Sequence, residues 1–166
     1  GSAIKWEIYV TPEGSALPAD NTTVSDIPPY YIATSNPFTV TGLQPSTNYV
    51  YYVRAICSDT NVSVWSIIEP KNFITAPAND DCDKTINVPV SPNLNCDQMV
   101  AGSTLGATKS IQENTCKGEA DDDVWFSFVA IDPIQTIEFK NITGGTSTLN
   151  HVLYSGDDCA ALTPLH

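Results

Sequence analysis

The sequence predicts an all-β protein with two antiparallel β-sandwiches in tandem. Thr, Val, Ile and Tyr are plentiful, and 12 prolines and 9 glycines interrupt the chain throughout its length. The apolar stretches between these breaks are short, and none has the spacing of an amphipathic helix. At 166 residues with 42% apolar side chains, the chain is long enough for two small modules with cores.

The charge balance limits the possible partners. There are 7 basic and 19 acidic residues, giving a formal net charge of −12, and no stripe of Lys or Arg. Such a surface repels phosphate backbones, so nucleic acid is excluded as a partner. Neutral polymers such as glycans, protein surfaces and divalent cations fit the charge better. No run approaches the roughly 18 apolar residues of a membrane span, so none is expected.

The first module is expected over residues 1–77. Its first strand is predicted at 6–10, where large apolar side chains alternate with mixed ones, and the long polar run that follows contains one strand-like stretch, 30–33. Two more strands are predicted at 38–40 and 49–57. Alternation places one set of side chains on a single face of the last strand: Tyr49, Tyr51, Val53, Ala55 and Cys57.

Two patterns in this half resemble a fibronectin type III domain. Leu43-x-Pro45-x-x-x-Tyr49, running into Val53-Arg54-Ala55, is similar to the tyrosine corner and the strand after it. Trp6-x-Ile8-x-Val10 resembles the third strand of that family, and Phe73-Ile74-Thr75 its last. The resemblance implies an immunoglobulin-like sandwich, in which the Tyr49 hydroxyl bonds to backbone near Leu43 or Gln44.

The same resemblance implies two further strands ahead of Trp6. We therefore expect a module that lacks its first strands and leaves one apolar face of its sheet uncovered. Such a face is expected to be hidden by self-association, by strand exchange or by docking of the second module.

The second module is expected over residues 78–166, after a shift to small and acidic residues. Within its strand at 136–142, Ile137 and Phe139 are expected to point inward. The predicted strands are short and bounded by Gly, Asn, Asp or Pro: 86–90, 100–107, 124–129, 136–142 and 151–154.

This half resembles the jelly-roll-like modules related to bacterial pre-peptidase C-terminal domains. The stretches that carry the resemblance are 79–82, 106–108, 121–128 and 154–159, of which Asp-Asp-Val-Trp-Phe-x-Phe within 121–128 is the most specific. The resemblance implies a module truncated at its C-terminus. It also implies a large secreted or cell-surface bacterial protein, in which such modules accompany fibronectin type III repeats.

Five cysteines are scattered without a Cys-x-x-Cys pair or the histidine spacing of a zinc site. In a β-rich chain with few lysines they indicate disulfides formed in an oxidising, extracellular compartment. The preferred pairing is Cys82 with Cys96 and Cys116 with Cys159, which leaves Cys57 alone. Other connectivities remain open, because sequence does not determine them.

Acidic clusters suggest a calcium site. Calcium takes six to eight oxygen ligands, and loops rich in Asp and Asn supply them. We expect two runs to converge on one ion, although such residues also cap turns and solvate loops. The candidate ligands are Asn79, Asp80, Asp81, Asp121, Asp122 and Asp123. Of the three consecutive aspartates at 121–123, at most two are expected to bind the ion.

Exposed tyrosines are the candidates for sugar binding, because an aromatic ring packs against the apolar face of a pyranose. Tyr30 and Tyr31 lie in the long polar run, and Tyr9 and Tyr52 are expected on outward faces. The three tryptophans are instead expected in the core: Trp6, Trp65 and Trp125.

No catalytic motif is present. The chain contains no Gly-x-Ser-x-Gly, His-Glu-x-x-His or Walker sequence. His151, Ser155 and Asp157 lie within one strand and its turn, where the geometry of a catalytic triad is difficult to form. The sequence therefore favours a non-catalytic adhesion, spacer or substrate-targeting segment. The alternatives are a carbohydrate-binding accessory region of a polysaccharide-degrading enzyme and a calcium-dependent hydrolase.

Overall fold

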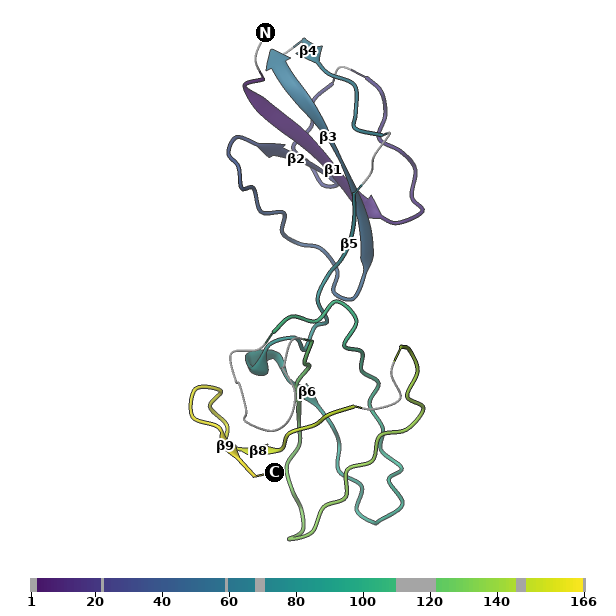
Figure 1. The fold of residues 1–166 in the computed structure, drawn as a ribbon, viewed down its shortest axis with the longest axis vertical. Coiled ribbons are helices and arrows are strands. Elements are labelled where there is room, and N and C mark those ends of the chain that lie inside the picture. Colours follow the sequence, from purple (N-terminus) through teal and green to yellow (C-terminus); the bar gives the residue numbers. More distant parts are fainter. Residues whose placement is uncertain are drawn as a thin grey trace. The chain divides into compact units, whose positions relative to one another are not determined.

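The computed structural model describes residues 3–21, 23–58, 60–67, 71–109, 122–145 and 149–165. The chain divides into two compact units, Gly1–Thr75 and Ala76–His166, and each is described by itself. Strands and one 3₁₀ turn make up the regular structure of the described residues (Figure 1), so the all-β class is confirmed. Among these residues, no helix has the length and apolar character needed to cross a bilayer.

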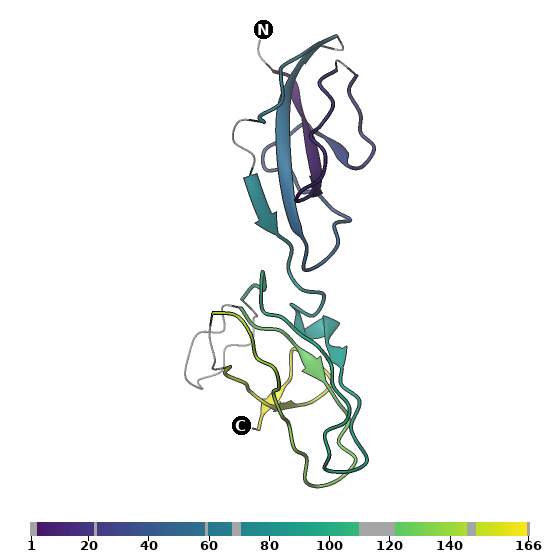
Figure 2. The same cartoon turned by 90° about the vertical axis from the view of Figure 1, so that its right-hand side faces the viewer.

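The described part of unit 1 forms one antiparallel sheet. The strand order is β2-β1-β3-β4, and β5 also pairs with β3. β1 and β3 are the two long central strands (Figures 1 and 2), and they pair from Lys5 opposite Ile56 to Pro12 opposite Tyr49. The bounds are β1 Lys5–Pro12, β2 Tyr30–Ala33, β3 Asn48–Ser58, β4 Asn61–Val62 and β5 Lys71–Ile74.

Three of the predicted strands in this unit are confirmed, and the fourth is not. Residues 38–40 form no strand and run as an irregular connection between β2 and β3. Pro37 and Pro45 flank this stretch, and each proline removes a backbone donor that a sheet ladder would need. A second sheet, which a complete sandwich requires, is therefore not formed among the described residues of unit 1.

The best-buried face of the sheet is the one expected to point outward. Tyr9 and Tyr52 lie opposite each other on β1 and β3 and expose only 9% and 6% of their surface. They form a core cluster with Val50 and Trp65. The expectation that Tyr9 and Tyr52 are exposed was wrong because the polar run after β1 packs over them. The Tyr9 hydroxyl donates to Ala16 O at 3.3 Å.

The predicted hydrogen bond between Tyr49 and the backbone near Leu43 or Gln44 is confirmed. The Tyr49 hydroxyl accepts a hydrogen bond from the Gln44 N–H at 3.0 Å, and the ring is buried. Phe73 of β5 stacks on the same ring at a centroid distance of 5.7 Å. This contact joins the 35–47 connection, β3 and β5 at one end of the sheet.

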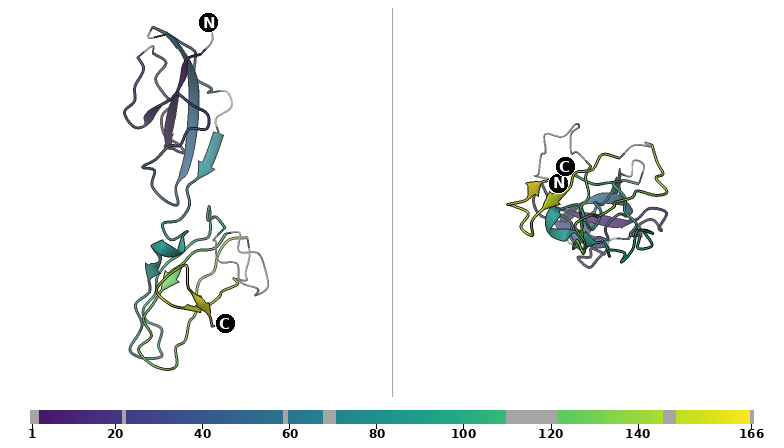
Figure 3. Two further views of the ribbon diagram at one scale, coloured as in Figure 1. Left: turned by 90° about the vertical axis from the view of Figure 1, so that its left-hand side faces the viewer. Right: turned by 90° about the horizontal axis from the view of Figure 1, so that it is seen from below.

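Unit 2 has far less regular structure. β6 (Ile86–Asn87) pairs with β7 (Phe126–Ser127), β8 (Tyr154–Ser155) pairs with β9 (Thr163–Pro164), and a 3₁₀ turn spans Cys82–Lys84. Figures 2 and 3 show irregular chain over most of the remaining described length. The β6–β7 pair is parallel, which corrects the expectation of an antiparallel arrangement throughout.

Two predicted strands of unit 2 are absent from the described residues. Neither 100–107 nor 136–142 is assigned to a strand. Ile137 and Phe139 are about half exposed, so the expectation that they point inward was wrong. Alternation assigns side chains to opposite faces, but it buries one face only when another layer covers it.

The predicted disulfide pairing was also wrong. Cys82 is bonded to Cys159, 77 positions away, with a Cα–Cα distance of 5.9 Å, and not to Cys96. The bond is possible because the fold brings the 3₁₀ turn beside the loop after β8, a proximity that sequence spacing does not show. Among the described residues Cys57 and Cys96 are free thiols, as expected for Cys57. Cys116 lies outside the described residues.

Candidate functional site: an apolar groove on the sheet of unit 1

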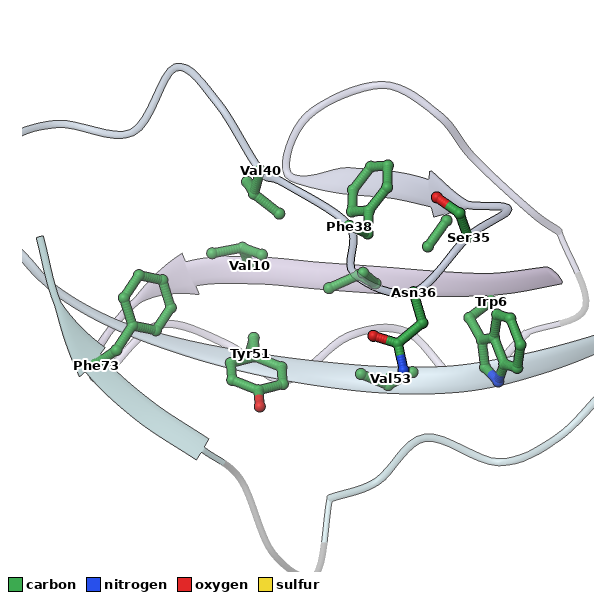
Figure 4. Close-up of a pocket in the computed structure, with 11 residues that line it drawn as sticks. Trp6, Val10, Ser35, Asn36, Phe38, Val40, Tyr51, Val53 and Phe73 are labelled. Atoms are coloured by element: carbon green, nitrogen blue, oxygen red, sulfur yellow. The ribbon is translucent and has the colours of Figure 1, made fainter.

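The opposite face of the unit 1 sheet carries an apolar groove. Alternate residues of β1 and β3 form its base, and the end of β2, the connection after it and Phe73 of β5 form its sides (Figure 4). Its volume is about 440 Å³. Eleven residues line it: Trp6, Ile8, Val10, Ala33, Ser35, Asn36, Phe38, Val40, Tyr51, Val53 and Phe73.

The groove has an aliphatic floor and an aromatic rim. Val10 and Ala33 are buried at the floor. Trp6, Phe38 and Tyr51 remain 38%, 38% and 37% exposed. Part of each of these three aromatic rings is therefore open to water beside the buried floor.

Polar groups of the rim are available to a ligand. Within the part of the chain that the structure describes, no protein group pairs with the indole N–H of Trp6, the carboxamide of Asn36 or the hydroxyl of Tyr51. The Ser35 hydroxyl donates to Pro37 O at 3.3 Å. No lining residue carries a charge. The site can therefore exchange hydrogen bonds with a ligand, but offers it no ion pair.

A buried ion pair lies on the other face of the same two strands. Arg54 donates from Nε to Glu7 Oε2 at 2.6 Å, and both residues are buried. The Ser25 N–H donates to the other oxygen of Glu7 at 2.8 Å. Arg54 also donates to the carbonyls of Asn21 and Thr23. The pair thus fastens the polar run to the sheet and fixes the strands that present the groove.

The Trp65 ring completes this arrangement. Arg54 Cζ lies 4.5 Å from its centroid, within the range of a cation–π contact, and the indole N–H donates to Ala19 O at 3.1 Å. This network was not predicted from the sequence. The available signal was Arg54, the only arginine of the chain, which occupies a strand position between apolar residues.

None of the four tyrosines proposed for sugar binding lines the groove. Tyr9 and Tyr52 are in the core, as described above. Tyr30 is half-buried, with its ring centroid 4.8 Å from that of Tyr9, and Tyr31 is half-buried on β2. Trp65 is buried as expected, whereas Trp6 is exposed at the rim and Trp125 is only half-buried.

Three of the expected calcium ligands, Asn79, Asp80 and Asp81, have protein partners in the structure. The Asp80 carboxylate accepts from the N–H and the hydroxyl of Thr108, at 2.6 and 2.7 Å. Asp81 accepts from Lys84 at 2.9 Å, a hydrogen bond that raises the pKa of Lys84. Asn79 is buried and donates from Nδ2 to Trp125 O at 2.9 Å.

No metal-binding cluster of three His, Cys, Asp or Glu residues occurs among the described positions. Asp122 is exposed and Asp123 is half-buried. Asp121 lies outside the described residues, so the predicted convergence of the two acidic runs remains a prediction.

The three residues considered above as a catalytic triad are not hydrogen-bonded to one another in the structure. His151 packs against Phe139 with ring centroids 5.5 Å apart, while Ser155 belongs to β8. No hydrogen bond links His151, Ser155 or Asp157 to one another in the described parts of unit 2. The arrangement shows none of the nucleophile–base contacts that acyl transfer requires.

Comparisons with known proteins identify no relative. No protein-family model matches the chain, no curated protein matches it, and no solved structure matches it.

Proposed function

We propose that the chain is a non-catalytic binding and spacer segment of a large secreted or cell-surface bacterial protein. The groove carries this proposal, because three aromatic side chains remain more than a third exposed around one apolar depression. Clustered exposed apolar surface of this kind marks sites of ligand or partner binding.

The module assignment belongs to the same proposal. We assign unit 1 as fibronectin type III-like, supported by the bond between Tyr49 and Gln44 and by the antiparallel pairing of β1, β3 and β5. We assign unit 2 as pre-peptidase C-terminal-like, with both units as β-sandwich modules in tandem. The disulfide between Cys82 and Cys159 supports an oxidising, extracellular compartment.

The proposed function predicts that the chain adheres to a surface and hydrolyses no substrate. The purified chain, immobilised on beads, should be retained on surfaces coated with extracellular proteins or polysaccharides. It should not hydrolyse ester, lactone or peptide substrates, with or without a chelator. Retention together with no hydrolysis is the expected result. Hydrolysis that a chelator abolishes would contradict the proposed function and would favour a calcium-dependent hydrolase.

We also propose that calcium binds the acidic runs as a structural ion. Binding to the folded state alone would raise the melting temperature as calcium is added. Identical melting curves in millimolar calcium and in excess chelator would refute the site at Asn79–Asp83 and 121–123. The binding and spacer function would stand in that case, because the groove contains no acidic residue.

A further inference from the structure

We propose that the groove of unit 1 binds a neutral glycan, with Trp6 as the stacking platform and Asn36 and Tyr51 as hydrogen-bonding groups. This inference rests on the proposed binding function and names the class of ligand for the same site. It is carried by the size of the groove, by the absence of charge in its lining and by the nature of its exposed groups.

The exposed surface is too small for a stable contact with a second copy. Aromatic side chains bury about 150–250 Å² each when covered, so three rings at 37–38% exposure leave on the order of 200 Å² open. A stable protein interface buries roughly 800 Å² per partner. A volume of about 440 Å³ instead lies within the range of small-ligand sites.

The groove differs in charge from the chain as a whole. The chain carries a net charge of −12, yet none of the groove-lining residues is charged. An anionic ligand would meet the overall negative potential, and a cationic one would find no carboxylate in the groove. The ligand best suited to the lining is therefore neutral.

The exposed groups favour a ligand that is both apolar and rich in hydroxyls. A pyranose offers an apolar face of C–H groups, which packs on an indole ring, and hydroxyls around its edge. In Figure 4 the Asn36 carboxamide lies over Val53, with Trp6 on one side and Tyr51 on the other. The carboxamide can donate and accept, as can a phenol, so both suit sugar hydroxyls. A lipid chain would leave these groups unpaired.

Strand addition at the adjoining edge of the sheet is disfavoured. On β2, the Ile32 N–H donates to Asp26 Oδ1 and the Tyr30 N–H to Ile27 O, both at 2.9 Å. These two edge donors are therefore already paired and do not offer a template to an incoming strand. The open face, and not this edge, is the surface left for a ligand.

Titration calorimetry of the whole chain with short neutral oligosaccharides of glucose, mannose and xylose tests the inference. At least one of these probes should bind, and Trp6→Ala should weaken its affinity about tenfold. Asn36→Ala and Tyr51→Phe should each weaken it about threefold, because they remove one hydrogen-bonding group and leave Trp6 in place. Since Asn36 is exposed, its substitution keeps the test valid if Trp6→Ala fails to fold.

Phe139→Ala is the matched control, because it removes a half-exposed aromatic ring from unit 2 and should leave the affinity unchanged. Failure of the folded chain to bind any of these sugars would overturn the inference, as would binding that is insensitive to the Trp6 and Asn36 substitutions. Self-association in light scattering that Trp6→Ala abolishes would also overturn it and would assign the groove to a second copy. If the beads adhere to extracellular proteins while no sugar binds, the binding function survives and only the glycan assignment fails.

Discussion

The two units of this chain maintain their structure in different ways. Unit 1 has an eight-residue strand paired with an eleven-residue strand, and their shared face buries tyrosine, valine and tryptophan side chains. In the described part of unit 2 the strands have two residues each, and only Pro77 and Asn79 are buried. A covalent crosslink between Cys82 and Cys159 joins distant parts of this second unit.

The two units therefore contain different stabilising features, paired long strands in one and a crosslink in the other. Long paired strands fix many backbone groups and create a face on which side chains pack, so unit 1 has a core without a disulfide of its own among its described residues. Where strands are short, few apolar groups leave water. Constraining the unfolded chain then becomes a larger part of stability.

The largest effect is expected from breaking the buried ion pair of unit 1. Glu7→Gln leaves the Arg54 charge buried without a counter-ion, so unfolding should require about 3–5 kcal/mol less. The double variant Glu7→Gln/Arg54→Met should recover part of the loss, because it removes the uncompensated charge. Urea denaturation monitored by tryptophan fluorescence measures both values. Glu138→Gln, which removes an exposed ion pair with Lys140, should leave the midpoint unchanged.

Opening the disulfide should have the next largest effect, and it should be confined to unit 2. Cys82→Ser removes the crosslink that closes the longest loop of the unit, which typically costs about 2–4 kcal/mol. Hydrogen exchange resolved along the chain should show lost protection beyond residue 76 and little change in β1 and β3. Cys96→Ser is the control and should change nothing, whereas equal destabilisation by Cys96→Ser would restore the pairing of Cys82 with Cys96.

A smaller loss is expected from Asn79→Ala. This substitution removes the buried side-chain bond to Trp125 O and should cost about 1–2 kcal/mol. The Trp125 carbonyl keeps one partner after this substitution, because the Ile86 N–H also donates to it. Thermal unfolding followed by circular dichroism gives the difference, with the exposed Asn150→Ala as control. A loss no greater than that of the control would show that Asn79 does not anchor unit 2.

The smallest of these effects concerns the tyrosine corner. Tyr49→Phe keeps the ring and removes the acceptor of the Gln44 N–H, so it should cost about 1 kcal/mol. Tyr51→Phe on the same strand removes a hydroxyl at the exposed rim and should leave the denaturation midpoint unchanged. Equal midpoints for the two variants would count against a fibronectin-like corner.

The fold of unit 1 was predictable where the alternation of apolar side chains coincides with the strands that pair in the sheet. The alternation at 6–10 and 49–57 and the turn residues at Pro12 and Gly14 give the central strands. The spacing from Leu43 to Tyr49 led to a specific hydrogen bond that the structure contains. The pattern at 38–40 wrongly predicted a strand, because alternation alone takes no account of the nearby prolines, which remove ladder donors.

The candidate site was harder to predict than the strands. Period two placed Tyr51 and Val53 on one face, but the face of Tyr9 and Tyr52 was the one expected to point outward, whereas in the structure the groove lies on the face of Tyr51 and Val53. Whether Tyr9 or Trp6 faced water could not be derived, because both faces of β1 carry large apolar side chains. The face that became the core is the one covered by the polar run, which is held there by Glu7, Arg54 and backbone carbonyls.

By itself, the sequence determined the β class, the long strands of unit 1, the hydrogen bond between Tyr49 and Gln44 and the strongly negative net charge. These follow from side-chain period, turn chemistry and composition, which act over a few residues or over the whole chain. The tertiary structure alone decided that Cys82 joins Cys159, that Arg54 is neutralised by Glu7 and that Trp6 borders an open groove. Each of these depends on segments far apart in the chain becoming neighbours, and that proximity is created by packing, not by local spacing.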